Sequence, residues 1–529
     1  MLRGTRRGFR RDVGPLALTF VSLGSIIGSG WLLGASTAAT SAGGSSILSW
    51  LLGGLIIVLL ALVHAELGAA YPLAGGTARW PRVAFGSLGG FTAGWVSWLA
   101  NAMLGPIEVE AALGYLDHQW HGLISGDGGL TPAGLTAATA LMSLFAVINV
   151  LGVRWLAGSN SIVVAWKIAV PVLTVAVLIV VSFHAANFTT GGGFAPYGVH
   201  GVLAALPLGI VFALQGFEQA TQLGSEARDP QRNVPRAVIG SVILGTLLYL
   251  ALEIAFIGAL TPAGLQQGWA NSVGKGDFGP YVTLAAELGL GWLAVILYLD
   301  AFISPAGTGL VSVGSSGRLA YALGYAGYVP RAASRISPRG VPHVSIMLAF
   351  VVGLVFFLLF PSWKDLVQLI TAATGIMYAF APITLLALRK ADPDRARPYR
   401  LPIAPVLAPV AFVAANEIVY WTSWATVHKL MLVVAAGYLI FGTSYVLSRP
   451  LERPPLDSWS LAWITPWLAG LTVISYLGRY DGTKLIPEWV DIGVVAAFSL
   501  LICYAAVHFR LSTERVTATV AADQREAPD

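Results

Sequence analysis

The chain has 529 residues, of which 56% are hydrophobic and only 11% charged, and its net charge is +5. Soluble proteins carry about 25% charged residues, so this sequence has too little polar surface to cover a globule in water. The composition therefore excludes a soluble globule and indicates an all-α protein that uses lipid as its solvent. The single cysteine, Cys503, excludes a disulfide framework and a cysteine-based metal cluster, and we expect no metal site.

Apolar runs long enough to cross a bilayer recur along the whole sequence. A hydrocarbon core of about 30 Å requires roughly 20 apolar residues in a helix. The sequence predicts fourteen such spans, at residues 13–36, 44–70, 86–115, 131–152, 158–182, 201–223, 236–260, 281–317, 341–360, 365–388, 402–422, 430–447, 459–477 and 488–509. Prolines make the eleventh and thirteenth spans the least regular.

The basic residues give this map an orientation. With a cytoplasmic N-terminus, 25 of the 31 Lys and Arg residues fall on the cytoplasmic side, five fall in outer loops, and Lys167 lies inside a span. Such an asymmetry follows the positive-inside rule. We therefore expect a multi-pass protein of the inner (plasma) membrane with both termini in the cytoplasm. The basic excess then faces anionic lipid, and no nucleic-acid partner is needed.

Two predicted spans contain signals for a broken helix. The first includes GSIIGSGW at residues 24–31, where three glycines at mid-membrane depth each weaken a helix by about 1 kcal/mol. The sixth includes FALQGFE at residues 212–218. Close packing of helices through small residues is the alternative explanation. We favour broken helices because corresponding interruptions in two halves of a chain indicate the substrate site of a transporter.

The chemistry of such breaks suits a zwitterion. A helix interrupted in the membrane exposes backbone N–H groups on one side of the break and carbonyl groups on the other. The N–H groups that would suit a carboxylate are those around Ser25, Ile26, Gly28, Ser29 and Gly30. The carbonyl groups that would suit an ammonium are those around Phe212, Ala213 and Leu214, beside Gly216. The sequence therefore predicts an α-amino acid as the substrate.

Four motifs resemble those of the amino acid–polyamine–organocation (APC) superfamily. In chain order they are GSIIGSGW at 24–31, AELG with PLAGG at 65–76, GFE with EARDPQRNVPR at 216–236, and SPAGTG at 304–309. Their combination is far more specific than any one alone. The variant GGTARWP at 75–81 and two extra helices resemble the aspartate:proton symporter-like branch.

The resemblance implies a leucine-transporter-type fold, in which ten helices form two inverted repeats. The implied organisation is a basic cytoplasmic N-terminus (1–12), a transport core (13–390) with repeats at about 13–182 and 201–388, four peripheral spans (391–509) and a disordered cytoplasmic tail (510–529). The resemblance also implies a proton gradient or exchange as the energy source. Independently, the sequence contains neither a Walker-type phosphate loop nor a His-Glu-x-x-His metal pair, so we expect no cofactor.

Charged residues inside the spans are candidates for proton coupling, because a charge at mid-bilayer costs about 3 kcal/mol or more. The resemblance places Lys167 where proton-coupled relatives carry a lysine in place of sodium; the alternative is snorkelling to the interface. Asp300, Ser304 and Thr308 share one helix face. In the APC superfamily this helix supplies hydroxyls to the cation site, so the resemblance implies that Ser304 and Thr308 hydrogen-bond Lys167. Asp300 is expected to pair with Lys167 or to titrate; a polar stripe against a wet cavity is the alternative.

Glutamates in the spans are possible relays. Glu108 and Glu110 are two residues apart and point to different faces of a helix, so at most one should reach the pathway. Glu253 in the seventh span is a further possible relay. Glu218 is expected to brace the broken sixth helix rather than to bind substrate.

These observations predict a secondary active transporter of amino acids, with amino acid and proton as partners. A proton-coupled importer is the first hypothesis, since Lys167 and Asp300 supply groups that can titrate. An exchanger of amino acids or amines is the second. An ion channel or a non-transporting membrane protein is the third, but the sequence shows no symmetric filter motif or charged ring. No particular amino acid and no oligomeric state is predicted.

Overall fold

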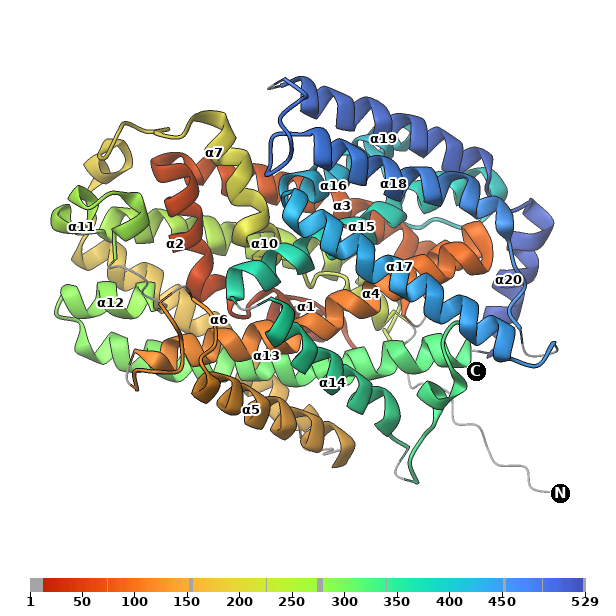
Figure 1. Ribbon diagram of the computed structural model, residues 1–529, viewed down its shortest axis with the longest axis horizontal. Helices are drawn as coiled ribbons and strands as arrows, with labels where there is room; N and C mark the ends of the chain where they lie inside the picture. Colours follow the sequence, from red (N-terminus) through yellow and green to blue (C-terminus); the bar gives the residue numbers. More distant parts are fainter. Residues whose placement is uncertain are drawn as a thin grey trace.

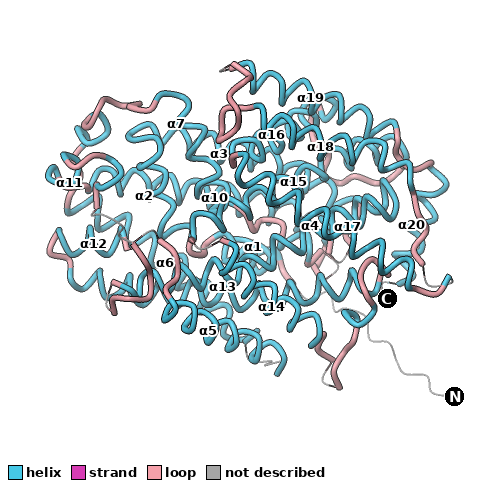
Figure 2. The backbone as a smooth tube through the Cα atoms, viewed as in Figure 1, coloured by secondary structure: helices cyan, strands magenta, loops and turns pink. Residues whose placement is uncertain are grey.

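The computed structural model describes residues 13–526, apart from residues 74, 119, 127, 152–155, 225, 274–278, 339, 361, 451–452 and 488. The predicted basic N-terminus, residues 1–12, lies outside the described residues. Within them, the regular structure is helical, and pairing between extended segments is limited to isolated bridges. Figure 2 shows these helices joined by short loops. The prediction of an all-α protein is confirmed.

The transport core predicted from the sequence is built from helices of very different length. In chain order they are α1 (Pro15–Ile26), α2 (Gly30–Ala42), α3 (Ser46–Ala70), α4 (Gly76–Asp117), α5 (Pro132–Leu151), α6 (Leu156–Val181), α7 (Gly198–Ala205), α8 (Val211–Leu214), α9 (Gln219–Gln222), α10 (Pro230–Ala259), α11 (Pro262–Gln266), α12 (Pro280–Glu287), α13 (Gly291–Tyr325), α14 (His343–Leu359) and α15 (Trp363–Ala391). A π-helical turn at Leu206–Ile210 joins α7 to α8.

The remaining helices pack beside this set. They are α16 (Ala404–Trp421), α17 (Trp424–Leu447), α18 (Leu461–Leu477), α19 (Val490–His508) and α20 (Thr513–Glu526). Figure 1 shows α16 to α19 gathered along one side of the molecule, with α11 and α12 at the opposite end. Helix α16 packs against α15 and α19, so it connects the peripheral helices to the rest.

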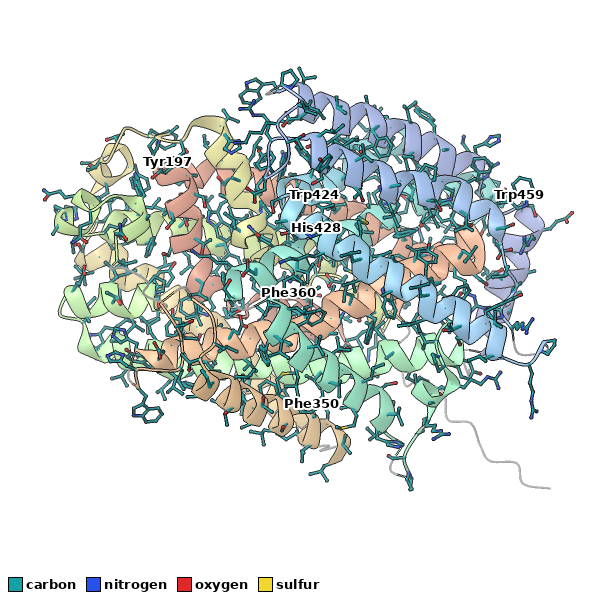
Figure 3. All side chains as sticks on the ribbon, in the orientation of Figure 1. Tyr197, Phe350, Phe360, Trp424, His428 and Trp459 are labelled. Carbon is teal, nitrogen blue, oxygen red and sulfur yellow. The ribbon has the colours of Figure 1, made fainter. Side chains whose placement is uncertain are left out.

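The helices have the length and the surface of a membrane protein. Among the described residues, ten helical stretches are long and apolar enough to cross a bilayer, and three shorter apolar helices add to them. Leu55, Leu439 and Leu501 are 67%, 72% and 69% exposed, which only lipid makes favourable in such number. Figure 3 labels Trp459, which is 71% exposed, among the side chains on the outside. The polytopic membrane class is confirmed.

Both predicted helix interruptions are present. Helix α1 ends at Ile26 and α2 begins at Gly30, so the first span is two short helices. Helix α8 ends at Leu214 and α9 begins at Gln219. The sequence indicates both interruptions through their glycines, because glycine has no side chain to restrict its backbone and so destabilises a helix.

The C-terminal segment differs from its prediction. Residues 513–526 form α20 instead of a disordered tail. Its buried side chains, Val516 and Val520, are four residues apart and so share one face of the helix. Arg515 forms an ion pair with Asp457, which precedes α18. A polar sequence with two well-spaced valines can therefore dock as an amphipathic helix, which the overall polarity of the segment concealed.

Candidate substrate and proton site

The two interrupted helices touch each other at their breaks. A side-chain carbon on Gly216, which has φ +112°, would lie 2.9 Å from the backbone carbonyl carbon of Ser25. A side-chain carbon on Gly30 would lie 2.9 Å from the Cα of Ala213. Both glycines are therefore required because backbone meets backbone directly, and at Gly216 also because the positive φ disfavours other residues.

Each break leaves backbone polar groups available. In the part of the chain that the structure describes, the N–H groups of Gly28 and Gly30 donate no hydrogen bond, and the carbonyls of Ala213 and Leu214 accept none. These are N–H groups at the first break and carbonyls at the second, as the sequence predicts. Buried backbone groups are rarely left unpaired, so a ligand or water is needed to satisfy them.

Ser25 and Ile26 correct the predicted set of carboxylate-binding N–H groups. Helix α1 continues through Ile26, and the N–H of Ile27 still donates to the carbonyl of Leu23 at 3.0 Å. The N–H groups of Ser25 and Ile26 therefore point back into α1, where helical geometry pairs them with the preceding turn. The available N–H groups start only at Gly28.

Glu108 of α4 reaches into the first break. Its Oε2 accepts a hydrogen bond from the N–H of Ser29 at 2.9 Å. Its Oε1 lies where a side-chain carbon on Gly28 would come within 2.6 Å. The N–H of Ser29, which the sequence assigns to a substrate carboxylate, is thus already bonded to a carboxylate of the protein. Glu110 does not line the cavity, whereas Glu108 does, and Glu110 has no hydrogen-bond partner among the described residues.

Lys167 of α6 joins three helices. Its Nζ donates to the carbonyl of Gly24 in α1 at 3.1 Å and to Oγ1 of Thr308 in α13 at 2.6 Å. The residue is only 3% exposed, so it does not snorkel to an interface. The hydrogen bond from Lys167 to Thr308 is as predicted.

Ser304 and Asp300 are arranged differently from the prediction. Ser304 Oγ donates to Asp300 Oδ1 at 2.7 Å, and Trp31 Nε1 donates to Asp300 Oδ2 at 3.0 Å. The expected bond from Ser304 to Lys167 is therefore wrong, and no ion pair within 4.0 Å joins Asp300 to Lys167 in the described structure. Ser304 lies one turn from Asp300 on α13, so the carboxylate is its nearest acceptor.

The other two predicted glutamates lie at different places. Glu218 accepts from the N–H of Gly216 at 3.0 Å and from the hydroxyl of Tyr378 at 2.8 Å, so it supports the break. Glu253 accepts from Ser46 and from Trp50 Nε1 of α3 and lies outside the cavity lining. The structure does not bring Glu253 to the site.

A cavity of about 100 Å³ lies between the breaks. The predicted residues that line it are Ser25, Ile26, Gly28, Gly30, Glu108, Lys167, Phe212, Ala213, Gly216 and Thr308. The predicted residues outside the lining are Ser29, Leu214, Asp300 and Ser304, with Glu110 and Glu253. Polar lining residues absent from the prediction are Asn101, Gln215, Gln219, Ser312, Ser315 and Thr374. Their only sequence signal was polarity inside an apolar span.

Comparison with known proteins fits this geometry. Residues 13–441 match a family model described as amino acid permease. The chain belongs to the amino acid permease family. This membership confirms the resemblance to the APC superfamily that the four motifs indicate, and it makes the chain a transporter of amino acids.

Similar proteins cover nearly the whole chain. It is 35% identical over 515 residues to the glutamate/serine transporter AimA of Bacillus subtilis (strain 168), covering 95% of each chain. It is 35% identical over 507 residues to the aspartate-proton symporter of the same bacterium, covering 94% of this chain and 96% of the relative. The L-asparagine permease of Escherichia coli (strain K12) is 28% identical over 481 residues, with 85% and 88% covered.

Proposed function

We propose that this permease imports amino acids across the plasma membrane in symport with protons. The observation that carries the proposal is the meeting of the two breaks, where free N–H groups of Gly28 and Gly30 and the free carbonyl of Ala213 belong to residues that line one cavity. A zwitterionic amino acid satisfies both sets at once. The name of the aspartate-proton symporter, 35% identical, supports the proton as the coupling ion.

The finer architecture is part of the proposal. Each of the fourteen predicted spans overlaps helix in the structure. The interruptions between α1 and α2 and between α8 and α9 fall in the first and sixth spans, which begin the two halves of a five-plus-five inverted repeat. Paired interruptions at equivalent positions are typical of transporters with such repeats. We therefore retain fourteen crossings, with the last four outside the transport core.

The proton is proposed to act through Lys167 and its neighbours. A charged ammonium can donate to the carbonyl of Gly24 and to Thr308 together, which ties α1 to α13. Loss of the proton removes a donor and the charge, and therefore weakens the tie. Protonation then biases one conformation of an alternating-access cycle. Glu108 lies beside Thr308 at Gly28, so it belongs to the same group of titratable residues.

Uptake into proteoliposomes tests the function. We expect a pH gradient, acidic outside, to concentrate a labelled amino acid inside the vesicles, and dissipation of the gradient to abolish the accumulation. Vesicles loaded with unlabelled amino acid serve as the comparison. Uptake that does not depend on the pH gradient but requires unlabelled amino acid inside the vesicles would contradict symport and would support amino-acid exchange.

The proposed orientation is tested by cysteine labelling. Ala270 is exposed in the loop expected outside, and Ala396 is exposed in the loop expected in the cytoplasm. In a Cys503→Ser background, a membrane-impermeant maleimide added to intact cells should label Ala270→Cys and not Ala396→Cys. Cys503 is the single cysteine of the sequence, so this background leaves the introduced thiol as the one that can react. Labelling of Ala396→Cys from outside would overturn the map.

A further inference from the structure

Gln215 presents an unsatisfied hydrogen-bond donor at the cavity. The residue follows α8 directly and lines the cavity beside the second break. Its Oε1 accepts a hydrogen bond from Thr374 Oγ1 of α15 at 2.8 Å. Its Nε2 is buried and has no partner in the described structure. Leaving a buried donor unpaired is costly, so a group that enters the cavity is needed to complete it.

The position of the amide separates it from the carboxylate end of the proposed site. Trp363, near the start of α15, donates to Ser29 Oγ at 3.4 Å, next to the free N–H groups of the first break. Thr374 lies 11 residues further along α15, which is about 16 Å along a helix axis. Thr374 holds the amide of Gln215, so this amide lies at a different level from Ser29.

The chemistry of the amide also separates it from the ammonium end. Nε2 is a donor, and an ammonium group has only donors, so the two cannot hydrogen-bond. The free carbonyl of Ala213, which lines the cavity, is an acceptor available to the ammonium. The part of an amino acid left for Nε2 is therefore its side chain.

Apart from Thr374, the residues of α15 that line the cavity are apolar. Ile370, Thr374 and Met377 line the cavity from one face of α15, at the spacing of successive helical turns. Thr374 is already used by Gln215, and the two remaining residues of that face, Ile370 and Met377, are apolar. Such a site binds a substrate with a side-chain oxygen more tightly than a hydrocarbon of the same size, because the hydrocarbon leaves Nε2 without an acceptor.

We propose that Gln215 Nε2 reads the substrate's side chain and makes the permease prefer amino acids with a side-chain oxygen, namely a hydroxyl, amide or carboxylate, over aliphatic isosteres. The inference rests on the proposed function, because it requires an amino acid in this cavity.

The test compares isosteric substrates in proteoliposomes. Threonine against valine and asparagine against leucine differ in hydrogen bonding at similar size. For the wild-type permease we expect each oxygen-bearing member to be taken up at least about tenfold more efficiently, as kcat/KM, than its partner. In Gln215→Met we expect the ratio to fall to within about twofold. Gln368→Met is the matched control, because Gln368 also accepts from a threonine, Thr426 at 3.3 Å, but lies outside the cavity lining.

A second variant guards against a folding defect. Gln215→Glu keeps an oxygen for Thr374 and replaces the donor Nε2 by an acceptor. Uptake of aspartate, whose ionised side chain can only accept, should therefore fall relative to leucine while the protein elutes as a monodisperse peak. Unchanged ratios in folded Gln215→Met, or undiminished aspartate uptake in folded Gln215→Glu, would overturn the inference. So would a wild-type permease that takes valine and leucine as well as their partners. A wild type that transports no amino acid at all would instead defeat the proposed function.

Discussion

Lys167→Ala is expected to abolish uptake driven by an inward proton gradient while substrate binding persists. Among the described residues, the variant removes the only Lys or Arg that lines the cavity, together with its hydrogen bonds to Gly24 and Thr308. Without the ammonium that ties α1 to α13, the gradient can no longer bias the conformational cycle through this contact. Accumulation should fall to the level of equilibration, whereas binding, measured in parallel in detergent, should change in affinity but remain. The measurement is uptake at several internal and external pH values.

Two further variants are to be compared with Lys167→Ala. Lys429→Ala is the matched control, since Lys429 lies over the ring of Phe360, 4.9 Å from its centroid, and outside the cavity lining. Asp300→Asn should give a milder loss, because Asp300 is held by Trp31 and Ser304 and does not contact Lys167. Lys167→Ala that concentrates substrate as the wild type does, with the same pH dependence, would remove the lysine from the mechanism.

The broken helices could be predicted because their signals are local. Glycine clusters weaken a helix wherever they occur, so residues 24–31 and 212–218 mark the interruptions without knowledge of the partner helix. The same holds for the spans, whose apolar length is set by the bilayer. Even here the end of α1 was uncertain by a few residues, and this shifted the usable N–H groups from Ser25 to Gly28.

The hydrogen-bond partners could not be predicted because they depend on helices far apart in the sequence. Spacing puts Ser304 and Thr308 on one face of α13, but only packing decides that Thr308 meets Lys167 and that Ser304 meets Asp300. Likewise, Glu108 and Glu110 are two residues apart in a helix, so their side chains lie on different faces. Which of them reaches the break follows from the packing of α4, which brings Glu108 to the N–H of Ser29 between α1 and α2.

The two glycines of the first break have different neighbours. The carboxylate of Glu108 already sits beside Gly28, so a side chain at Gly28 would meet the end of a flexible side chain that can turn away. At Gly30 the neighbour is the backbone of Ala213, which cannot turn away without moving α8. Of the two glycines, Gly30 is therefore the sharper test of a substrate site made of backbone groups.

Gly30→Val is expected to weaken amino-acid binding by about 10- to 100-fold, since overpacking of this kind costs about 1–3 kcal/mol and here falls on the binding geometry itself. The added carbons would force α2 away from Ala213 and so separate the N–H groups of the first break from the carbonyls of the second. Substrate affinity, measured by calorimetry or by substrate-induced thermal stabilisation, is the readout, and Gly30→Ala should show a smaller loss of the same sign.

Gly240→Val supplies the matched control, because a side-chain carbon on this helical glycine of α10 would meet no atom within 4 Å. It should bind substrate as the wild type does. If folded Gly30→Val also bound with wild-type affinity, the free N–H and carbonyl groups would not be the substrate's partners, and the amino acid would have to be held by side chains elsewhere in the cavity. If both valine variants lost binding equally, the loss would reflect general destabilisation, which the melting temperature of each protein without substrate would reveal.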